Sequence, residues 1–178
     1  YWKTGHSHMK RRVHELGALA GFEKSGHYFL APPIGKGYDD GMRVAVELCK
    51  LLDRNPDKTM AELREALPVT YGSPTMSPHC ADEEKYDVLG RLQEKLVAMG
   101  ERGDSLGPRK ITGVVTVNGA RVMLDNGAWA LVRASSNTPN LVVVCETPES
   151  RTELKAIFEA LDAVIRTEPS VGAYDQTL

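Results

Sequence analysis

Apolar residues repeat every three or four positions in two stretches of the first third of the chain, which predicts two amphipathic helices, and a short third helix is expected after them. Between the first two lies a short apolar run at residues 28–30, which is typical of a strand and ends near a proline pair. Asp39 or Asp40 is placed to cap the second helix, and Thr59 with Glu62 forms a reciprocal capping box for the third. The predicted helices cover about residues 7–20 before Gly21, residues 42–52, and a short segment that follows Thr59 and ends before Pro68.

The remaining part of the chain alternates between short apolar segments and turns, with a helix at either end. A helix over about residues 82–99, capped by Asp82, precedes four apolar segments. Asn118-Gly119 is the strongest hairpin signal in the chain, because both turn positions need a positive φ. A second capping box, Ser150 with Glu153, opens the last helix. The expected strands cover residues 111–117, 121–124, 128–133 and 140–146.

These elements divide the chain into two blocks. Residues 1–68 form a partial mixed α/β domain with two strands at most, so we expect its remaining strands upstream of Tyr1. Residues 69–178 form a small antiparallel sheet covered by two helices, with a tail from about residue 168. Residues 68–80 are rich in proline and glycine and are interpreted as a linker about which the blocks rotate. The predicted fold class is therefore α/β followed by α+β.

Composition narrows the function classes. With 178 residues, 42% of them hydrophobic and 26% charged, the chain is ordinary globular protein and not disordered. A net charge of −2 and 6% aromatic residues argue against a nucleic-acid partner. Three distant cysteines exclude a disulfide scaffold and suit the cytoplasm, and no apolar run is long enough to span a membrane.

Polar residues that could carry chemistry gather first at a predicted strand-to-helix junction, residues 2–8. The free N–H groups of a helix start, together with Lys3 and His6, would suit an anion. Equally, Ser7 or His6 could simply cap the helix. His6 and His8 could ligate a metal, but no third ligand has a recognisable spacing.

Two later segments carry denser polar sets. In residues 23–27, EKSGH, a carboxylate, a hydroxyl and an imidazole on one tight turn can hydrogen-bond several hydroxyls of a sugar, although a solvated turn is the simpler interpretation. Residues 133–139, RASSNTP, place a guanidinium beside hydroxyls and an amide, which are the donors that satisfy phosphate oxygens. The alternative is an ordinary polar strand connection, but such a connection usually contains the turn glycine that this segment lacks.

Four segments, taken in order, resemble the α-D-phosphohexomutase family, in particular its phosphomannomutase/phosphoglucomutase members. They are WKTGHS, EKSGHYF, GYDDG and LVRASSNTPNLVV, and the resemblance extends from Trp2 to about Thr167. EKSGH and RASSNTP are specific as a pair and favour a mannose or glucose mutase over a glucosamine mutase. Members of the family have four domains, so the resemblance implies that residues 1–68 are the second half of domain three and residues 69–178 are domain four.

The resemblance also implies roles for individual residues: some would bind the ring hydroxyls of the sugar and others would clamp its phosphate. It implies no catalytic or metal-binding residue in this chain. The implied sugar-binding residues are Glu23, Ser25, His27 and His6, and the implied phosphate-binding residues are Arg133, Ser135, Ser136, Asn137 and Thr138, with Lys3 as a further candidate.

The activity that the resemblance implies is the interconversion of hexose 6-phosphate and hexose 1-phosphate through a 1,6-bisphosphate. The family's phosphoserine loop and magnesium loop lie in its first two domains, and no segment here matches either. We therefore expect Mg²⁺ to serve the parent enzyme through ligands outside this chain, and we expect no turnover by this chain alone. The implied partners are mannose or glucose 1- and 6-phosphates and the upstream domains of the same protein.

Three other interpretations remain open at this point. The chain could be a phosphosugar-binding module without chemistry, a fragment of a phosphoglucosamine mutase, or an interaction domain. In the last case Glu23 and Arg133 would be ordinary surface residues. Whether Glu23 and Arg133 face one cleft distinguishes an enzyme or a binding module from an interaction domain.

Overall fold

The computed structural model describes all 178 residues, which form two compact units, residues 1–68 and 69–178. The first unit has three helices and one β-hairpin, and the second has a six-stranded sheet with two helices. No helix in either unit is both long enough and apolar enough to span a membrane. The first unit contains α1 (His6–Leu16), β1 (Ala20–Phe22), β2 (Tyr28–Leu30), α2 (Gly41–Asp53) and α3 (Met60–Glu65).

The hairpin of β1 and β2 forms because α1 ends earlier than its apolar pattern predicts. Gly17 adopts a left-handed conformation with φ of 58°, and its N–H bonds back to the carbonyl of His14, which ends the helix. The expected helix end at residue 20 is therefore wrong, because that residue begins β1. A Cβ on Gly21 would lie 2.6 Å from the side chain of Val13, so the glycine allows the hairpin to pack closely on α1.

Two helix starts in the first unit follow from side-chain caps. Asp40, not Asp39, caps α2, since its Oδ1 accepts a hydrogen bond of 2.9 Å from the backbone N–H of Arg43. At the start of α3, the hydroxyl of Thr59 accepts from the N–H of Glu62, and the Glu62 carboxylate accepts from the N–H of Thr59. The predicted capping box is confirmed.

The second unit is an antiparallel sheet with strand order β3-β8-β7-β6-β5-β4. The predicted meander of four strands is confirmed, and the structure adds the two-residue strands β3 and β4 at the edges. Its elements are β3 (Tyr71–Gly72), α4 (Lys85–Glu101), β4 (Ser105–Leu106), β5 (Arg109–Val115), β6 (Ala120–Leu124), β7 (Trp129–Ala134), β8 (Leu141–Thr147) and α5 (Arg151–Ile165).

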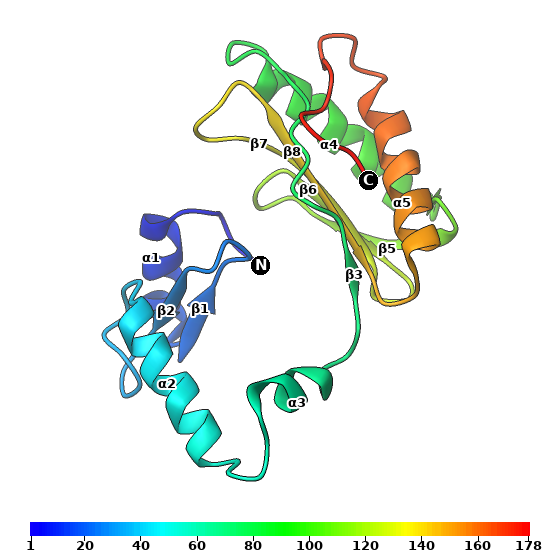
Figure 1. Cartoon of the computed structure of the whole chain (residues 1–178). Helices are drawn as coiled ribbons and strands as arrows, with labels where there is room; N and C mark the ends of the chain where they lie inside the picture. Colours follow the sequence, from blue (N-terminus) through cyan, green and yellow to red (C-terminus); the bar gives the residue numbers. More distant parts are fainter. The chain divides into compact units, whose positions relative to one another are not determined.

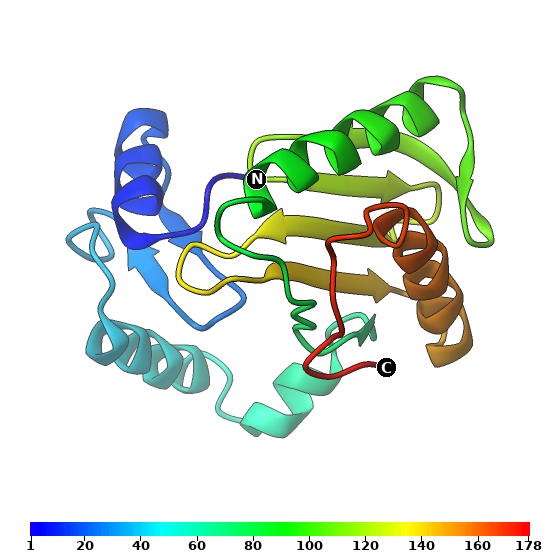
Figure 2. The same cartoon turned by 90° about the horizontal axis from the view of Figure 1, so that it is seen from above.

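One face of this sheet is covered by α4 and α5, which lie on the same side of it (Figures 1 and 2). Side chains along β6 alternate between buried and half-buried, as expected for a sheet with one covered face. The opposite face carries Arg121 of β6, whose guanidinium lies 3.7 Å from the ring centre of Trp129 on β7. The core therefore lies between the sheet and the two helices, and it contains Val122, Leu92 and Leu161 among its fully buried side chains.

The segment that the sequence indicated as a linker is largely part of the sheet. Tyr71 and Gly72 pair with β8, and the N–H of Met76 donates to the carbonyl of Val143 at 3.0 Å. Met76 and Cys80 are fully buried. Prolines are tolerated here because an edge strand leaves one side of its backbone unpaired. The linker interpretation is thus wrong for residues 71–80, which form an irregular edge strand.

Residues from Glu168 onward fold back on the second unit instead of extending as a tail. Val171 is buried, and the carboxylate of Asp175 accepts from the N–H of Ser77 at 2.6 Å. Glu168 is only 4% exposed, and its carboxylate accepts from Lys95 of α4 at 2.5 Å and from Arg91 at 2.8 Å. The hydrogen bond from Lys95 is the main cause of a lowered pKa at Glu168.

We predict that Glu168→Gln lowers the free energy of unfolding by about 1–2 kcal/mol at neutral pH, because it weakens two charge-assisted bonds whose cationic partners stay partly solvated. Urea unfolding of the chain measures the change. Glu159→Gln, which removes one exposed ion pair with Lys155, should cost less than about 0.5 kcal/mol and is the control.

The same pair of proteins gives a pH test. A lowered carboxyl pKa stabilises the fold above the unfolded value of 4.5, and this contribution is lost as the pH falls through the lower folded value. The stability difference between wild type and Glu168→Gln should therefore shrink as the pH falls below about 4.5. A difference that is constant down to pH 3 would contradict the ion-pair account.

Two turn glycines allow a second test, because both have a positive φ but only one lies against the neighbouring strand. A Cβ on Gly119 (φ 79°) would meet the carbonyl oxygen of Val132 at 2.2 Å and the Cα of Arg133 at 2.8 Å, whereas a Cβ on Gly127 (φ 85°) would meet nothing within 4 Å. Gly127→Ala should cost about 1 kcal/mol of unfolding free energy through backbone strain alone. Gly119→Ala should cost about 2 kcal/mol more through overpacking. Equal losses by urea unfolding would show that the close approach is unimportant.

Candidate functional site

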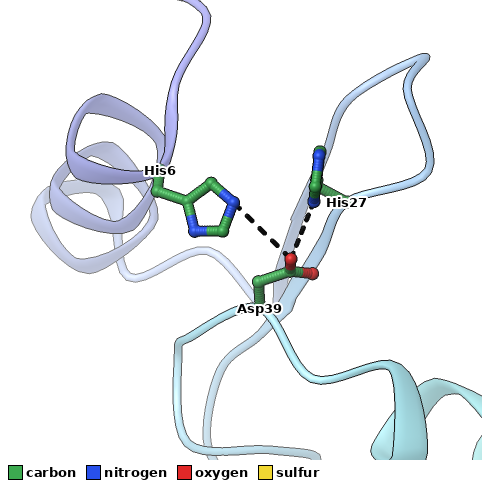
Figure 3. Close-up of side chains that lie close together, drawn as sticks. All are labelled: His6, His27 and Asp39. Carbon is green, nitrogen blue, oxygen red and sulfur yellow. Dashed lines mark hydrogen bonds and ion pairs between the residues drawn. The ribbon is translucent and has the colours of Figure 1, made fainter.

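Three polar side chains from separate segments of the first unit meet at one point (Figure 3). His6 is the first residue of α1, His27 precedes β2, and Asp39 lies just before α2. The Oδ2 of Asp39 lies 2.7 Å from Nδ1 of His27 and 3.6 Å from Nε2 of His6. The two imidazole rings are edge-on to each other with centroids 4.9 Å apart. This arrangement brings together two of the residues expected to bind sugar and adds a carboxylate to them.

Backbone pairing alongside β2 explains why Asp39 reaches the two histidines. Asp39 forms an isolated antiparallel bridge with Phe29, which is fully buried. Its Oδ1 also accepts a hydrogen bond of 3.0 Å from the backbone N–H of Tyr28. The hydrogen bond from His27 and then that from Tyr28 lower the pKa of Asp39, so its carboxylate is ionised at neutral pH.

Asp39 was not predicted as a site residue. Asp39 and Asp40 were expected to be alternative helix caps, and only Asp40 performs that role. A helix start needs one cap, so the presence of an additional aspartate in GYDDG was the available signal for Asp39.

Glu23 and Ser25 lie on the tight turn that joins β1 to β2. The turn is closed by backbone hydrogen bonds from Glu23 N–H to the carbonyl of His27 and from Gly26 N–H to the carbonyl of Glu23, each 3.0 Å. The Glu23 carboxylate accepts a 2.8 Å hydrogen bond from the N–H of Gly5 at the start of α1. This bond uses Oε1 alone, and Glu23 forms no ion pair with a buried cation. Ser25, at the turn, and Lys3, before α1, are exposed.

The cluster of His6, His27 and Asp39 has the donor types of a transition-metal site, because its three ligand atoms lie within 4.8 Å of one another. Two ligands of one tetrahedral metal ion would be roughly 3.3 Å apart at bond lengths of about 2.0 Å. The 2.7 Å contact between Asp39 and His27 is shorter and fits a direct hydrogen bond instead. The two nitrogen donors also do not fit Mg²⁺, which prefers oxygen ligands. His8 is not part of the cluster.

The connection between β7 and β8 forms the second polar cluster, and it projects beyond one end of the sheet (Figure 2). Ser135 organises it: its hydroxyl lies 2.8 Å from that of Thr138, and its backbone N–H donates to the carbonyl of Asn140 at 3.0 Å. Ser136 and Asn137 are exposed on the loop. Arg133 is half-buried at the end of β7, where its guanidinium donates to the carbonyl of Ala134 at 3.1 Å. All five expected phosphate-binding residues thus lie on or beside one ordered loop.

A buried cation supports this loop from within the unit. The Lys85 side chain is only 5% exposed, and its ammonium donates to the carbonyl of Thr138 at 3.1 Å and to the carboxylate of Asp82 at 2.6 Å. Asp82 is therefore an ion-pair partner and not the predicted helix cap; α4 begins without a side-chain cap. Lys85 was not predicted from the sequence, although its spacing to Val88 and Leu92 places it in line with the buried face of the helix.

Comparison with known protein families gives two matches in succession along the chain. Residues 1–71 match the phosphoglucomutase/phosphomannomutase alpha/beta/alpha domain III. Residues 79–164 match the phosphoglucomutase/phosphomannomutase C-terminal domain. The first match contains the cluster around Asp39, and the second contains the loop after Arg133.

Comparison with full-length proteins indicates the same family. A phosphomannomutase/phosphoglucomutase of Pseudomonas putida is 33% identical over 171 residues, which are 96% of this chain and 34% of the relative. One from Pseudomonas syringae is 35% identical over 165 residues, 93% of this chain and 32% of the relative. The crystal structure of a phosphoglucomutase/phosphomannomutase family protein from Burkholderia thailandensis superposes with a TM-score of 0.75 and 26% identity, covering 98% of this chain and 34% of that one.

The chain spans about a third of the length of these relatives. Both matching domain models and the relatives lead to one conclusion, and they also agree with the mixed architecture of the two units. The chain belongs to the phosphoglucomutase/phosphomannomutase family.

Proposed function

We propose that the protein containing this chain interconverts hexose 6-phosphate and hexose 1-phosphate, with mannose or glucose as the sugar, through a 1,6-bisphosphate. The observation that carries the proposal is that the chain matches two successive domains of the family and that each match contains one of the two polar clusters. In this proposal the first unit is part of domain three, and the second unit is domain four.

The polar residues of the first unit would bind the ring hydroxyls of the sugar. Glu23 accepts from Gly5 through one oxygen, so its other oxygen is available to accept from a hydroxyl. Ser25 is exposed and can both donate and accept, and the imidazoles of His27 and His6 are 44% and 52% exposed. Lys3 would add a positive charge near the start of α1 if an anionic group approaches there.

The second cluster would clamp the phosphate. The guanidinium of Arg133 supplies a charged, planar donor pair, and the neutral groups of Ser135, Ser136, Asn137 and Thr138 supply further donors. The buried ammonium of Lys85, which is paired with Asp82, holds the backbone of the loop in place through its hydrogen bond to the carbonyl of Thr138. A clamp on one phosphate together with a few hydroxyl contacts can hold the sugar in either of two orientations, as a cycle through a bisphosphate requires.

Transfer of the phosphoryl group would depend on domains outside this chain. We propose that upstream domains of the same protein carry the phosphoserine and the Mg²⁺ site, since the one candidate metal cluster here has donors that do not fit Mg²⁺. We further propose a cytoplasmic location, because all three cysteines are free thiols.

We predict that Arg133→Ala, made in the full-length protein, weakens binding of mannose 6-phosphate or glucose 6-phosphate about ten- to a hundredfold, through loss of a charge-assisted contact. Steady-state kinetics with Mg²⁺ and the bisphosphate activator measure KM and kcat. Arg102→Ala, which removes an exposed arginine paired with Asp104, is the control and should change neither constant. Unchanged constants in Arg133→Ala would contradict the assignment of the loop.

We also predict that this chain alone has no mutase activity and binds hexose phosphates no tighter than a Kd of roughly 1 mM, because it supplies only part of the contacts. Calorimetry and a coupled assay on the purified chain test both statements. Binding in the micromolar range without turnover in the full-length protein would support a phosphosugar-binding module instead. A full-length protein that acts on glucosamine phosphates and not on mannose or glucose phosphates would indicate a phosphoglucosamine mutase.

A further inference from the structure

The contacts of Asp39 suggest a role that goes beyond binding sugar. We propose that Asp39 is a positioning residue: it holds His27 in the tautomer with the proton on Nδ1, so that Nε2 is left to accept a hydrogen bond from a hydroxyl of the substrate. This inference rests on the proposed function, because it takes His27 to line the sugar site.

The geometry makes His27, and not His6, the partner of Asp39. The 2.7 Å separation between Oδ2 of Asp39 and Nδ1 of His27 is that of a hydrogen bond, whereas the 3.6 Å separation from Nε2 of His6 is too long for one. His6 contributes instead through its ring, which lies edge-on to His27 and to Phe29. The imidazole of His27 is thus fixed by a hydrogen bond on one side and by an aromatic ring on another.

The charge of Asp39 decides which atom donates. Its pKa is lowered, chiefly by the hydrogen bond with His27, so the carboxylate is ionised and can only accept. The proton in the 2.7 Å contact must therefore be on Nδ1 of His27. In a neutral imidazole this leaves Nε2 without a proton, as a hydrogen-bond acceptor.

Nε2 of His27 is available to accept a hydrogen bond. It has no hydrogen-bond partner in the structure, the side chain is 44% exposed, and this nitrogen points away from Asp39 (Figure 3). The turn with Glu23 and Ser25 comes directly before His27, and a backbone hydrogen bond from the N–H of Glu23 to the carbonyl of His27 closes it, so the acceptor belongs to the same turn as the groups proposed to bind sugar hydroxyls. Asp39 would act on the substrate only through His27.

The backbone N–H of Tyr28 makes Asp39→Asn a sharp test. This N–H donates to Oδ1 of Asp39 at 3.0 Å, so the oxygen of the new amide must face Tyr28 and its NH₂ group must face His27. Nδ1 of His27 would then have to accept, and the proton would move to Nε2. The variant keeps the size of the side chain and reverses the hydrogen-bonding character of Nε2 from acceptor to donor.

Nitrogen NMR of the histidine rings in this chain reads the tautomer directly, independently of activity. At about pH 9, above the usual titration range of imidazole, we expect the signals of a protonated Nδ1 and an unprotonated Nε2 for His27 in the wild type, and the reverse in Asp39→Asn. A His27→Gln variant assigns the signals. Asp40→Asn is the matched control, because asparagine also caps a helix and Asp40 has no contact with His27.

Kinetics of the full-length protein complete the test. Asp39→Asn should reduce kcat/KM about ten- to a hundredfold, and Asp40→Asn should leave it within about twofold of the wild type. A wild-type His27 with its proton on Nε2, or an Asp39→Asn enzyme with unchanged kcat/KM, would overturn the positioning role. Absence of turnover in the wild type would instead overturn the proposed function, and the NMR result distinguishes the two failures.

Discussion

The second unit depends on β8, which is paired along both of its sides. On one side it runs antiparallel to β7 over six residue pairs, and on the other it is bonded to β3 and to the irregular strand around Met76. Residues 141–145 of β8 are all buried as a result. Because β7 pairs with β8 up to Ala134 and Leu141, the loop between them is held at both ends by the sheet.

Patterns that depend on neighbouring residues were predictable from the sequence. The helices, the hairpin at Asn118-Gly119 and the reciprocal cap at Thr59 all follow from contacts within a few positions, and the structure contains each of them, although in the hairpin turn Gly119 has a positive φ and Asn118 does not. The sequence pattern gave a wrong prediction where pairing with a distant strand decided the local structure. Residues 71–80 look like a linker by composition, and they become an edge strand only because β8 offers unpaired backbone groups beside them.

The contrast between local patterns and distant contacts also separates the site residues that were predicted from those that were not. Glu23 and Arg133 stand in short polar runs that are recognisable by themselves. Asp39 and Lys85 matter through contacts with distant residues: Asp39 meets His27, 12 positions away, and Lys85 meets Thr138, 53 positions away. An aspartate before a helix and a lysine at a helix start are both common, so only the folded geometry distinguishes these two from their ordinary counterparts.

The edge strand and the C-terminal segment have a practical consequence for anyone who shortens this protein. The match to the C-terminal domain of the family covers residues 79–164, which omits both the strand around Met76 and the Glu168 contacts. A protein expressed to those limits would uncover one side of β8, a largely apolar strand whose backbone groups there would be left unpaired. Such an edge recruits the strands of other molecules, so the shortened domain should aggregate more readily than the longer one.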